Sequence, residues 1–268
     1  MEPVLGILYA TCKIKKDSRK AVDVTVSKLD PIVLELLKRA STATIQSQLF
    51  KLGLRNTFLF GLRPLNPDRA CFVGEAFTLR YVPAREDLDV LDVFNDPYHP
   101  QRYAIEQVQP GQVLVSDCRG DARAASGGEI LITRLAKRGA AAVITDGSVR
   151  DSRGVSQCGI PVYTAGISAT INLTLHHAVD FQIPIGCAGV SVYPGDILVG
   201  DHDGIVVIPR QLAEKVAEPA VEQERLERFI KTKIEAGAAL PGTYPPNDAT
   251  MSEYEEHSAR ASVRDSAS

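Results

Sequence analysis

The segment from residue 112 to residue 149 limits most what this chain can fold into. It reads as an apolar run (QVLVSD), a loop of small residues (CRGDARAASGG), a helical run (EILITRLAKRG) and a second apolar run (AAAVITDG). Strand, loop, helix and strand in this order are typical of a crossover between parallel strands. Gly139 is placed to close the helix. The chain is therefore predicted to be an α/β protein.

The flanking segments add helices and short strands. A helix is expected in PIVLELLKRA, with Asp30 as its N-cap and Pro31 as its first residue. A second helix is expected in TATIQSQLFKL and should end at Gly53. Strands are expected in FLFGL, EAFTLRYV, GIPVYTAG and IGCAGVSV, and a hairpin in DILVGD and GIVVIP. The acidic segment AREDLDVLDVFNDPYHP is expected to be a solvated helix and loop. Residues 211–236 predict a charged helix that Pro219 breaks or divides.

The organisation along the chain predicts one domain with two extensions. Residues 1–27 show no clear period and carry several lysines, as an N-terminal extension would. Residues 28–240 hold the periodic segments and form the expected folded domain. Residues 241–268 are polar and contain prolines, so we expect a C-terminal tail that is disordered or extends over a neighbour.

Composition excludes several classes of protein. The 30 Lys and Arg against 33 Asp and Glu give a net charge of −3, which disfavours a dedicated nucleic-acid binder. The 5 cysteines form no C-x-x-C pair, so neither a disulfide framework nor a zinc knuckle is indicated. No apolar run approaches the roughly 18 residues of a membrane helix. We expect a cytoplasmic protein without a membrane or nucleic-acid partner.

Two junctions of the crossover unit carry polar residues that a core does not require. Ser126–Leu131 opens a helix with paired glycines, whose free N–H groups can bind an anion. In Asp146–Asp151, Arg150 can pair with a carboxylate or enolate oxygen, and Asp151 can hold a hard divalent cation. For Ser126–Leu131, the alternative is an ordinary helix start with Glu129 at the positive end of the helix dipole. For Asp146–Asp151, the alternative is a surface turn in which Arg150 and Asp151 form a local ion pair.

Two other polar clusters are interpreted structurally. The segments Tyr193–Asp196 and Asp201–Gly204 have only part of a calcium loop, so they are predicted to be turns. His176 and His177 are neighbours whose side chains diverge on a helix, which makes a shared metal improbable.

Three motifs in order make the sequence similar to a known family. GGEILITRLAKRGAAAVITDGSVRD, with QPGQVLVSD upstream and YPGDILVGDHDGIVVIP downstream, resembles the RraA-like family over roughly residues 28–235. That family contains the metal-dependent 4-hydroxy-4-methyl-2-oxoglutarate aldolases and the proteins named regulators of ribonuclease activity. The resemblance implies an α/β layered sandwich with a swivelling β/β/α-type core, N-terminal helices and a C-terminal helix.

The resemblance also implies roles for particular residues. Arg150 corresponds to the arginine that binds the pyruvyl group, and Asp151 to the aspartate that binds the metal. Gly128, Glu129, Ile130 and Leu131 correspond to the Gly-Asp-Leu-Leu helix start, whose backbone amides receive the substrate carboxylate. Glu129 replaces the family's aspartate, which orients water at the metal, and its longer reach leaves substrate size and metal affinity open.

Assembly is implied in the same way. Family members are homotrimers or hexamers built as pairs of trimers, with sites between subunits, and a neighbouring subunit supplies a carboxylate. Glu222, Glu224 and Glu227 lie in a suitable stretch, and the sequence does not choose among them.

The leading hypothesis is a class II, Mg²⁺- or Mn²⁺-dependent lyase that cleaves a 4-hydroxy-2-oxo acid to pyruvate. Arg150 and Glu129 would be its catalytic residues, and oxaloacetate decarboxylation a companion activity. Two alternatives remain open: a dehydratase or decarboxylase of a sugar-derived acid, and a non-catalytic regulator that binds a ribonuclease.

Overall fold

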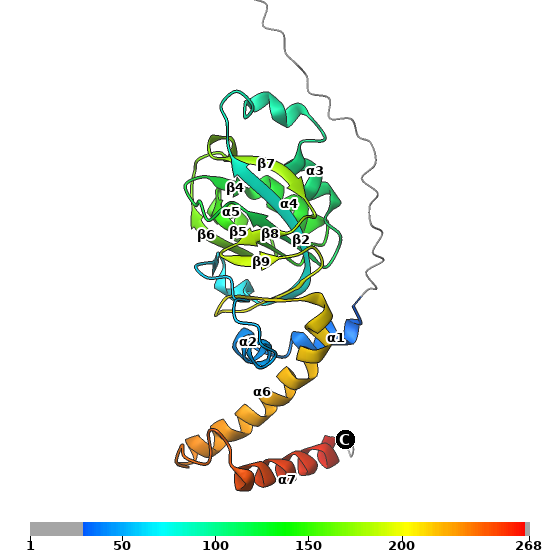
Figure 1. The fold of residues 1–268 in the computed structure, drawn as a ribbon, viewed down its shortest axis with the longest axis vertical. Coiled ribbons are helices and arrows are strands. Elements are labelled where there is room, and N and C mark those ends of the chain that lie inside the picture. The colour runs from blue at the N-terminus through cyan, green and yellow to red at the C-terminus, as the bar shows by residue number, and fades with distance from the viewer. Residues whose placement is uncertain (1–28, 266–268) are drawn as a thin grey trace, which may run out of the picture.

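The structure, a computed structural model, describes residues 29–265, with side chains described up to residue 260. The predicted N-terminal extension, residues 1–27, lies outside the described residues. Most of the described chain forms a sheet-based body, and two helices near the C-terminus project from one end of it (Figure 1).

A curled, nine-stranded sheet forms the body, with the strand order β1-β6-β5-β3-β2-β10-β11. Its central pairs β2–β3, β3–β5 and β5–β6 are parallel, and β10–β11 is an antiparallel hairpin. β4 pairs with β5, and β7 pairs with β2. The strands are β1 (Arg63–Pro64), β2 (Phe72–Pro83), β3 (Gln112–Asp117), β4 (Ala125–Gly127), β5 (Ala142–Val149), β6 (Val162–Ile167), β7 (His176–Phe181), β10 (Ile197–Gly200) and β11 (Ile205–Ile208).

The sheet is covered on both faces. On one face lie α3 (Pro100–Gln107), α4 (Glu129–Lys137) and α5 (Ser152–Val155), which share a core with β2, β3 and β5. The other face is covered by a small hairpin of β8 (Ile185–Cys187) and β9 (Val190–Val192). Every residue of β5 is buried, as expected for a parallel strand between two layers.

A third core lies beside the hairpin of β10 and β11. Against it pack α1 (Pro31–Leu37), α2 (Thr42–Lys51) and the first half of α6 (Ala213–Glu235). Asp30 caps α1 by accepting a hydrogen bond from the amide of Ile32, as the sequence predicts. The layers of sheet, hairpin and helices confirm the predicted α/β sandwich.

Several local predictions were wrong. FLFGL forms no strand, and only Phe58 makes an isolated bridge to Val206. His176 and His177 lie on β7 rather than on a helix. β5 continues to Val149, so Asp146 is a buried strand residue and not part of a turn. The strand extends because its last residues pair with both β4 and β6.

α6 is one continuous helix through Pro219, which the sequence predicts to break it. A proline removes one backbone hydrogen bond. The packing of buried residues on α6 against α1 and α2 keeps the helix intact around that gap. Gln48 of α2 adds a hydrogen bond from Nε2 to the Pro219 carbonyl at 3.3 Å.

The segment predicted as an irregular tail contains a helix, α7 (Asp248–Asp265), which folds back on α6. The ring of Tyr254 lies 5.6 Å from that of Phe229, and its hydroxyl donates to Glu222 at 2.6 Å. These contacts hold α7 against α6. The polar composition of the segment did not indicate them. The helical hairpin projects away from the sheet (Figure 1).

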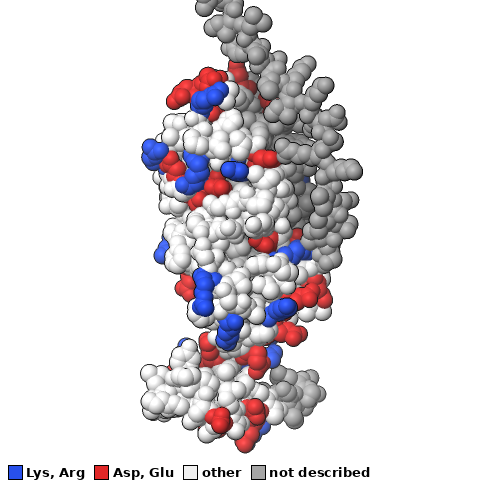
Figure 2. All heavy atoms as spheres, in the orientation of Figure 1, with Lys and Arg blue, Asp and Glu red and all other residues white. Residues whose placement is uncertain are grey.

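The face of the molecule seen in Figure 2 shows no extended field of one sign among the described residues. Acidic and basic side chains are interspersed over the face seen in Figure 2. In the part of the chain that the structure describes, no helix combines the length and the apolar character needed to cross a membrane.

Candidate active site

Arg150 and Asp151 lie side by side where β5 ends. Asp151 has the left-handed backbone conformation, with φ of 55° and ψ of 38°, and caps the short helix α5. This sharp turn brings its carboxylate back to Arg150, whose Nε lies 3.2 Å from Oδ2 of Asp151. Both side chains are almost half exposed, so a ligand can reach them.

The start of α4 packs directly against this pair. The amide of Arg150 donates to the carbonyl of Gly127 at 3.1 Å, and the amide of Glu129 donates to Oδ2 of Asp151 at 3.4 Å. A Cβ on Gly128 would lie 2.5 Å from that same Oδ2 and 2.9 Å from Cγ of Arg150. Only glycine permits this approach, so the two junctions predicted from the sequence meet here.

The remaining predicted residues form the first turn of α4. Its amides lack partners within the helix and carry partial positive charge, so they suit a carboxylate. Ile130 is 83% exposed, whereas Leu131 is partly buried. The Glu129 carboxylate lies against Gly154 of α5, where a Cβ would collide with it.

These groups open on a cavity of about 280 Å³, small enough for a short organic acid. Gly128, Ile130, Leu131, Arg150 and Asp151 line it, while Glu129 does not. The rest of the lining comes from residues that the sequence did not single out: Leu91, Phe94, Gln101, Arg102, Ala125, Gly127, Ile171 and Asn172.

Three of these additional residues are polar, and two elements supply them. Gln101 and Arg102 begin α3, and Asn172 lies in a short 3-10 helix, Asn172–Thr174. Gln101 is buried and donates from Nε2 to the Ser126 carbonyl at 2.7 Å, which fixes α3 against β4. The acidic composition around α3 predicts only a solvated helix and loop, and no local motif identifies these residues.

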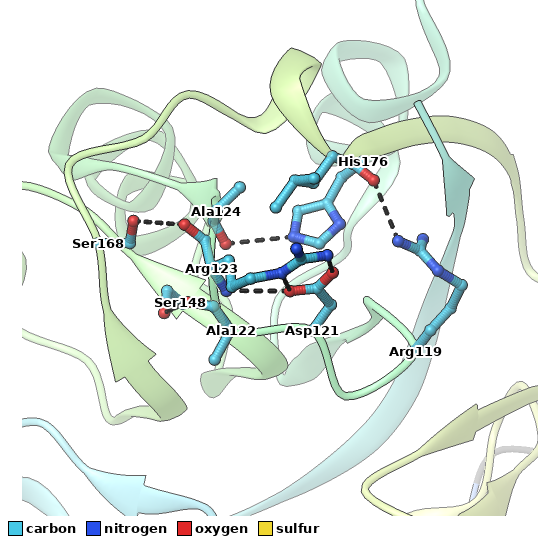
Figure 3. Close-up of polar contacts among 9 residues, drawn as sticks. Arg119, Asp121, Ala122, Arg123, Ala124, Ser148, Ser168 and His176 are labelled. Atoms are coloured by element: carbon cyan, nitrogen blue, oxygen red, sulfur yellow. Dashed lines mark hydrogen bonds and ion pairs between the residues drawn. The ribbon is translucent and has the colours of Figure 1, made fainter. Parts of the chain in front are cut away.

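The loop that leads into β4 is held by a network of polar contacts (Figure 3). The hydroxyl of Ser148 donates to the Ala122 carbonyl at 2.5 Å, and the hydroxyl of Ser168 donates to the Arg123 carbonyl at 2.7 Å. Nε2 of His176 lies 3.2 Å from the Ala124 carbonyl. This network sets the path of the chain just before Gly127 and Gly128.

Asp121 and Asp146 secure the same loop. Arg123 forms a two-pronged ion pair with Asp121 and thereby lowers the pKa of that carboxyl. The carboxylate of Asp146 accepts amide hydrogen bonds from Cys118, Gly120 and Ala188. Burial nevertheless raises the pKa of Asp146. Asp146 is therefore a buried structural anchor beneath the site.

The donor set at the junction fits a hard divalent cation. Asp151 offers an accessible carboxylate, and Glu129 follows Gly128 on the adjoining helix start. Among the described residues, no three His, Cys, Asp or Glu side chains form a metal-binding cluster. One or two carboxylates with water as the remaining ligands suit Mg²⁺ better than zinc or calcium.

The other polar clusters lie apart from the cavity. Nδ1 of His177 contacts Asp89 at 2.7 Å, and β7 directs His176 and His177 to opposite faces. The amide of Tyr193 donates to Asp196 at 2.8 Å, which closes a turn.

The three glutamates that might serve a neighbouring subunit lie on α6, and none lines the cavity of its own chain. Each is already bonded within the chain. Glu222 accepts from Tyr254, Glu224 accepts from the Thr44 hydroxyl, and Glu227 accepts from Gln223.

Comparison with known proteins identifies the family of this chain. Residues 42–207 match the model of the RraA-like family, described as Aldolase/RraA. A protein of Halalkalibacterium halodurans, provisionally named 4-hydroxy-4-methyl-2-oxoglutarate aldolase, is 31% identical over 65% of this chain and 79% of its own length. The crystal structure of Streptomyces coelicolor RraAS2, described as an unusual member of the RNase ES inhibitor RraA family, has a TM-score of 0.68. It is 30% identical and covers 76% of this chain and 97% of its own.

A structure from Pseudomonas syringae, of an uncharacterized protein, has a TM-score of 0.71 at 28% identity over 82% of this chain and 95% of its own. Sequence and three-dimensional structure thus agree over the segment that holds the strands, the helix start and the cavity. The chain belongs to the RraA-like family.

Proposed function

We propose that this protein is a divalent-metal-dependent lyase that cleaves a 4-hydroxy-2-oxo acid to pyruvate and a second carbonyl compound. The observation that carries the proposal is the meeting of Arg150, Asp151 and the glycine-initiated start of α4 on one small cavity. An arginine, a carboxylate and free helix amides together provide what a 2-oxo acid needs for binding. The aldolase name of the relative supports the same chemistry.

Arg150 and the first turn of α4 bind the pyruvyl end of the substrate. The guanidinium pairs with an oxygen of the 2-oxo acid, and the amides of Ile130 and Leu131 receive its carboxylate. Asp151 would hold Mg²⁺ or Mn²⁺, which supplies Lewis-acid stabilisation of negative charge on the 2-oxo group, and Glu129 would orient a water beside it.

Cleavage then needs a base for the C4 hydroxyl. Glu129 accepts a hydrogen bond from the water that removes this proton. The C3–C4 bond breaks, C4 becomes a carbonyl carbon, and the electron pair forms the enolate of pyruvate. Arg150 stabilises that enolate until C3 is protonated. Oxaloacetate loses carbon dioxide through the same enolate, so its decarboxylation accompanies the aldol cleavage.

The assembly belongs to the proposal as well. A homotrimer, or a pair of trimers, would bring the projecting helical hairpin of α6 and α7 to a neighbouring subunit, and a glutamate of α6 would complete the site. The proposed location is the cytoplasm.

A non-catalytic role is the second candidate, because RraAS2 is named within a family of ribonuclease inhibitors. Stoichiometric recovery of a ribonuclease with the protein, together with no metal-dependent turnover, would favour it. A lyase acting on sugar-derived acids remains the alternative chemistry for the same site, and a panel of such acids tests it by product identification.

The deciding experiment measures pyruvate release from oxaloacetate and from 4-hydroxy-4-methyl-2-oxoglutarate, with Mg²⁺ or Mn²⁺ and with EDTA. Arg150→Ala should lower kcat/KM for both compounds by about 10² to 10³-fold, because it removes the charge that stabilises the enolate. Arg153→Ala, which removes an exposed arginine of α5 outside the cavity lining, is the matched control. Full turnover by Arg150→Ala, or by the protein in EDTA, would overturn the assignment.

A further inference from the structure

The segment between β2 and α3 lies beside the cavity and has no core of its own. No residue from 85 to 98 is buried as a whole, and the regular structure of the segment is a short 3-10 helix, Leu91–Asn95. The amide of Asp89 donates to the Arg85 carbonyl, which closes a local turn. The segment lies at the end of the body opposite the hairpin of α6 and α7 (Figure 1). Segments with few buried contacts open at low cost in free energy, as active-site lids must.

Two residues of this segment, Leu91 and Phe94, form part of the cavity wall. The Phe94 ring lies 5.4 Å from the His99 ring, and the guanidinium carbon of Arg102 lies 4.4 Å from the centre of the Phe94 ring. Leu91 is 71% exposed, so its own packing does little to hold it at the cavity. The attachment of the chain on either side therefore sets where this part of the wall lies.

Asp89 attaches the segment on the side away from α3. Its side chain is only 2% exposed, although its neighbours Leu88 and Val90 are both exposed. Oδ1 of Asp89 accepts a hydrogen bond from Nδ1 of His177 on β7 at 2.7 Å, and Oδ2 accepts one from the amide of Arg85 at 2.8 Å. A carboxylate only accepts, so Nδ1 of His177 carries the hydrogen. Burial of a carboxylate is costly without such partners, so loss of His177 would free this part of the segment from β7.

We propose that His177 is a positioning residue, which through Asp89 holds residues 85–99 as a lid on the cavity. Opening of the lid admits the substrate, and closing places Leu91 and Phe94 against it. The inference rests on the proposed function, because it takes the cavity as the substrate site, and it adds the means by which access is controlled. His177 does not line the cavity, so its effect on a ligand must pass through the lid.

Steady-state kinetics separate this role from a catalytic one. His177→Ala should raise KM for 4-hydroxy-4-methyl-2-oxoglutarate by about 5- to 20-fold and change kcat less than about threefold, because the reacting groups stay in place while the lid is released. His177→Asn should restore most of the affinity, since its amide can donate from nearly the position of Nδ1. A kcat that falls as far as KM rises, or an Asn variant as impaired as the Ala variant, would overturn the inference.

Two carboxylates of the lid provide a matched pair of variants. Asp87 lies two residues from Asp89, pairs with Arg85 at 2.6 Å and is 64% exposed, and such exposed pairs contribute little. Asp89→Ala should therefore repeat the effect of His177→Ala, whereas Asp87→Ala should keep KM within about twofold. Combining His177→Ala with Asp89→Ala should add little to either change, because both remove one contact. Equal effects of Asp87→Ala and Asp89→Ala would show that only the charge of the lid matters and would contradict the proposal.

Amide hydrogen exchange tests the lid without any turnover. In the protein without ligand, His177→Ala should speed exchange in peptides from residues 85–99 by about tenfold or more and leave β3 and β5 unchanged. Pyruvate with Mg²⁺ should slow exchange of the same peptides in the unaltered protein.

The outcomes of this experiment distinguish the two proposals. Unchanged exchange of residues 85–99 in His177→Ala, or exchange that is equally faster in β3 and β5, would overturn the inference. Pyruvate that binds by calorimetry without slowing exchange of the lid would also overturn it. If His177→Ala speeds exchange of the lid alone, but the unaltered protein neither binds pyruvate nor turns over, the role of His177 stands and the lyase assignment fails.

Discussion

At the scale of single residues, Gly128 is the position where the site has least room. A methyl group there would meet the Asp151 carboxylate at 2.5 Å and the Arg150 side chain at 2.9 Å, so both must move. We expect Gly128→Ala to lower kcat/KM for pyruvate release by about 10²-fold, since small displacements of catalytic groups have effects of this size. Steady-state kinetics on folded protein measure the change.

Gly127 provides the comparison, because a Cβ there has no neighbour within 4 Å. Gly127→Ala should retain activity within about threefold. Equal losses in the two variants would show that glycine matters at this helix start for backbone conformation and not for contact with Arg150 and Asp151.

Two buried histidines make stability depend on pH. Burial lowers the pKa of His176 and of His99. Below about pH 6.5, the unfolded chain takes up protons at these rings while the folded chain resists it, so the unfolded state binds more protons. The free energy of unfolding should therefore fall as pH decreases from about 6.5 toward 5.

Urea denaturation across this range measures the effect. His176→Asn should flatten the dependence, whereas His202→Asn, at an exposed turn between β10 and β11, should leave it unchanged. A stability that stays constant from pH 7 to pH 5 would contradict the prediction.

At the scale of elements, α6 contains a proline that its packing tolerates. Pro219→Ala restores an amide within the continuous helix, at the expense of a more flexible unfolded chain. We expect the free energy of unfolding to rise by about 1 to 3 kcal/mol. Pro31→Ala, at the first position of α1 where proline is suited, should give no gain. A loss of stability in Pro219→Ala would mean that the core against α1 and α2 requires the proline.

Elements with strong local signals were predictable from the sequence. β3, α4 and β5 follow an uninterrupted pattern of apolar runs, a glycine-initiated helix and a closing Gly139, and the structure places them as expected. β7 was missed because its HHAVDF sequence lacks a clear alternation, and its pairing with β2 comes from a segment about a hundred residues away. α7 was missed because its stability comes from contact with Phe229 on another helix.

At the scale of the whole molecule, some residues of the site could be predicted from local sequence patterns, whereas others depend on contacts between distant segments. Gly128, Arg150 and Asp151 come together because neighbouring parallel strands end at one edge of a sheet, which a local pattern can anticipate. Arg102 and Asn172 reach the cavity through the packing of α3 and of the segment before β7. No spacing pattern in the sequence predicts that these two residues line the same cavity, because their positions depend on how distant segments pack over the sheet.

The cavity lining has a further consequence for how such a protein can change. Among the described residues of one chain, every residue that lines the cavity lies between Leu91 and Asn172. The helices α1, α2, α6 and α7, which lie before and after this stretch, line no part of it. The part of the cavity wall that one subunit supplies can therefore change through substitutions in one uninterrupted stretch of sequence, without any change in the helices near the two ends.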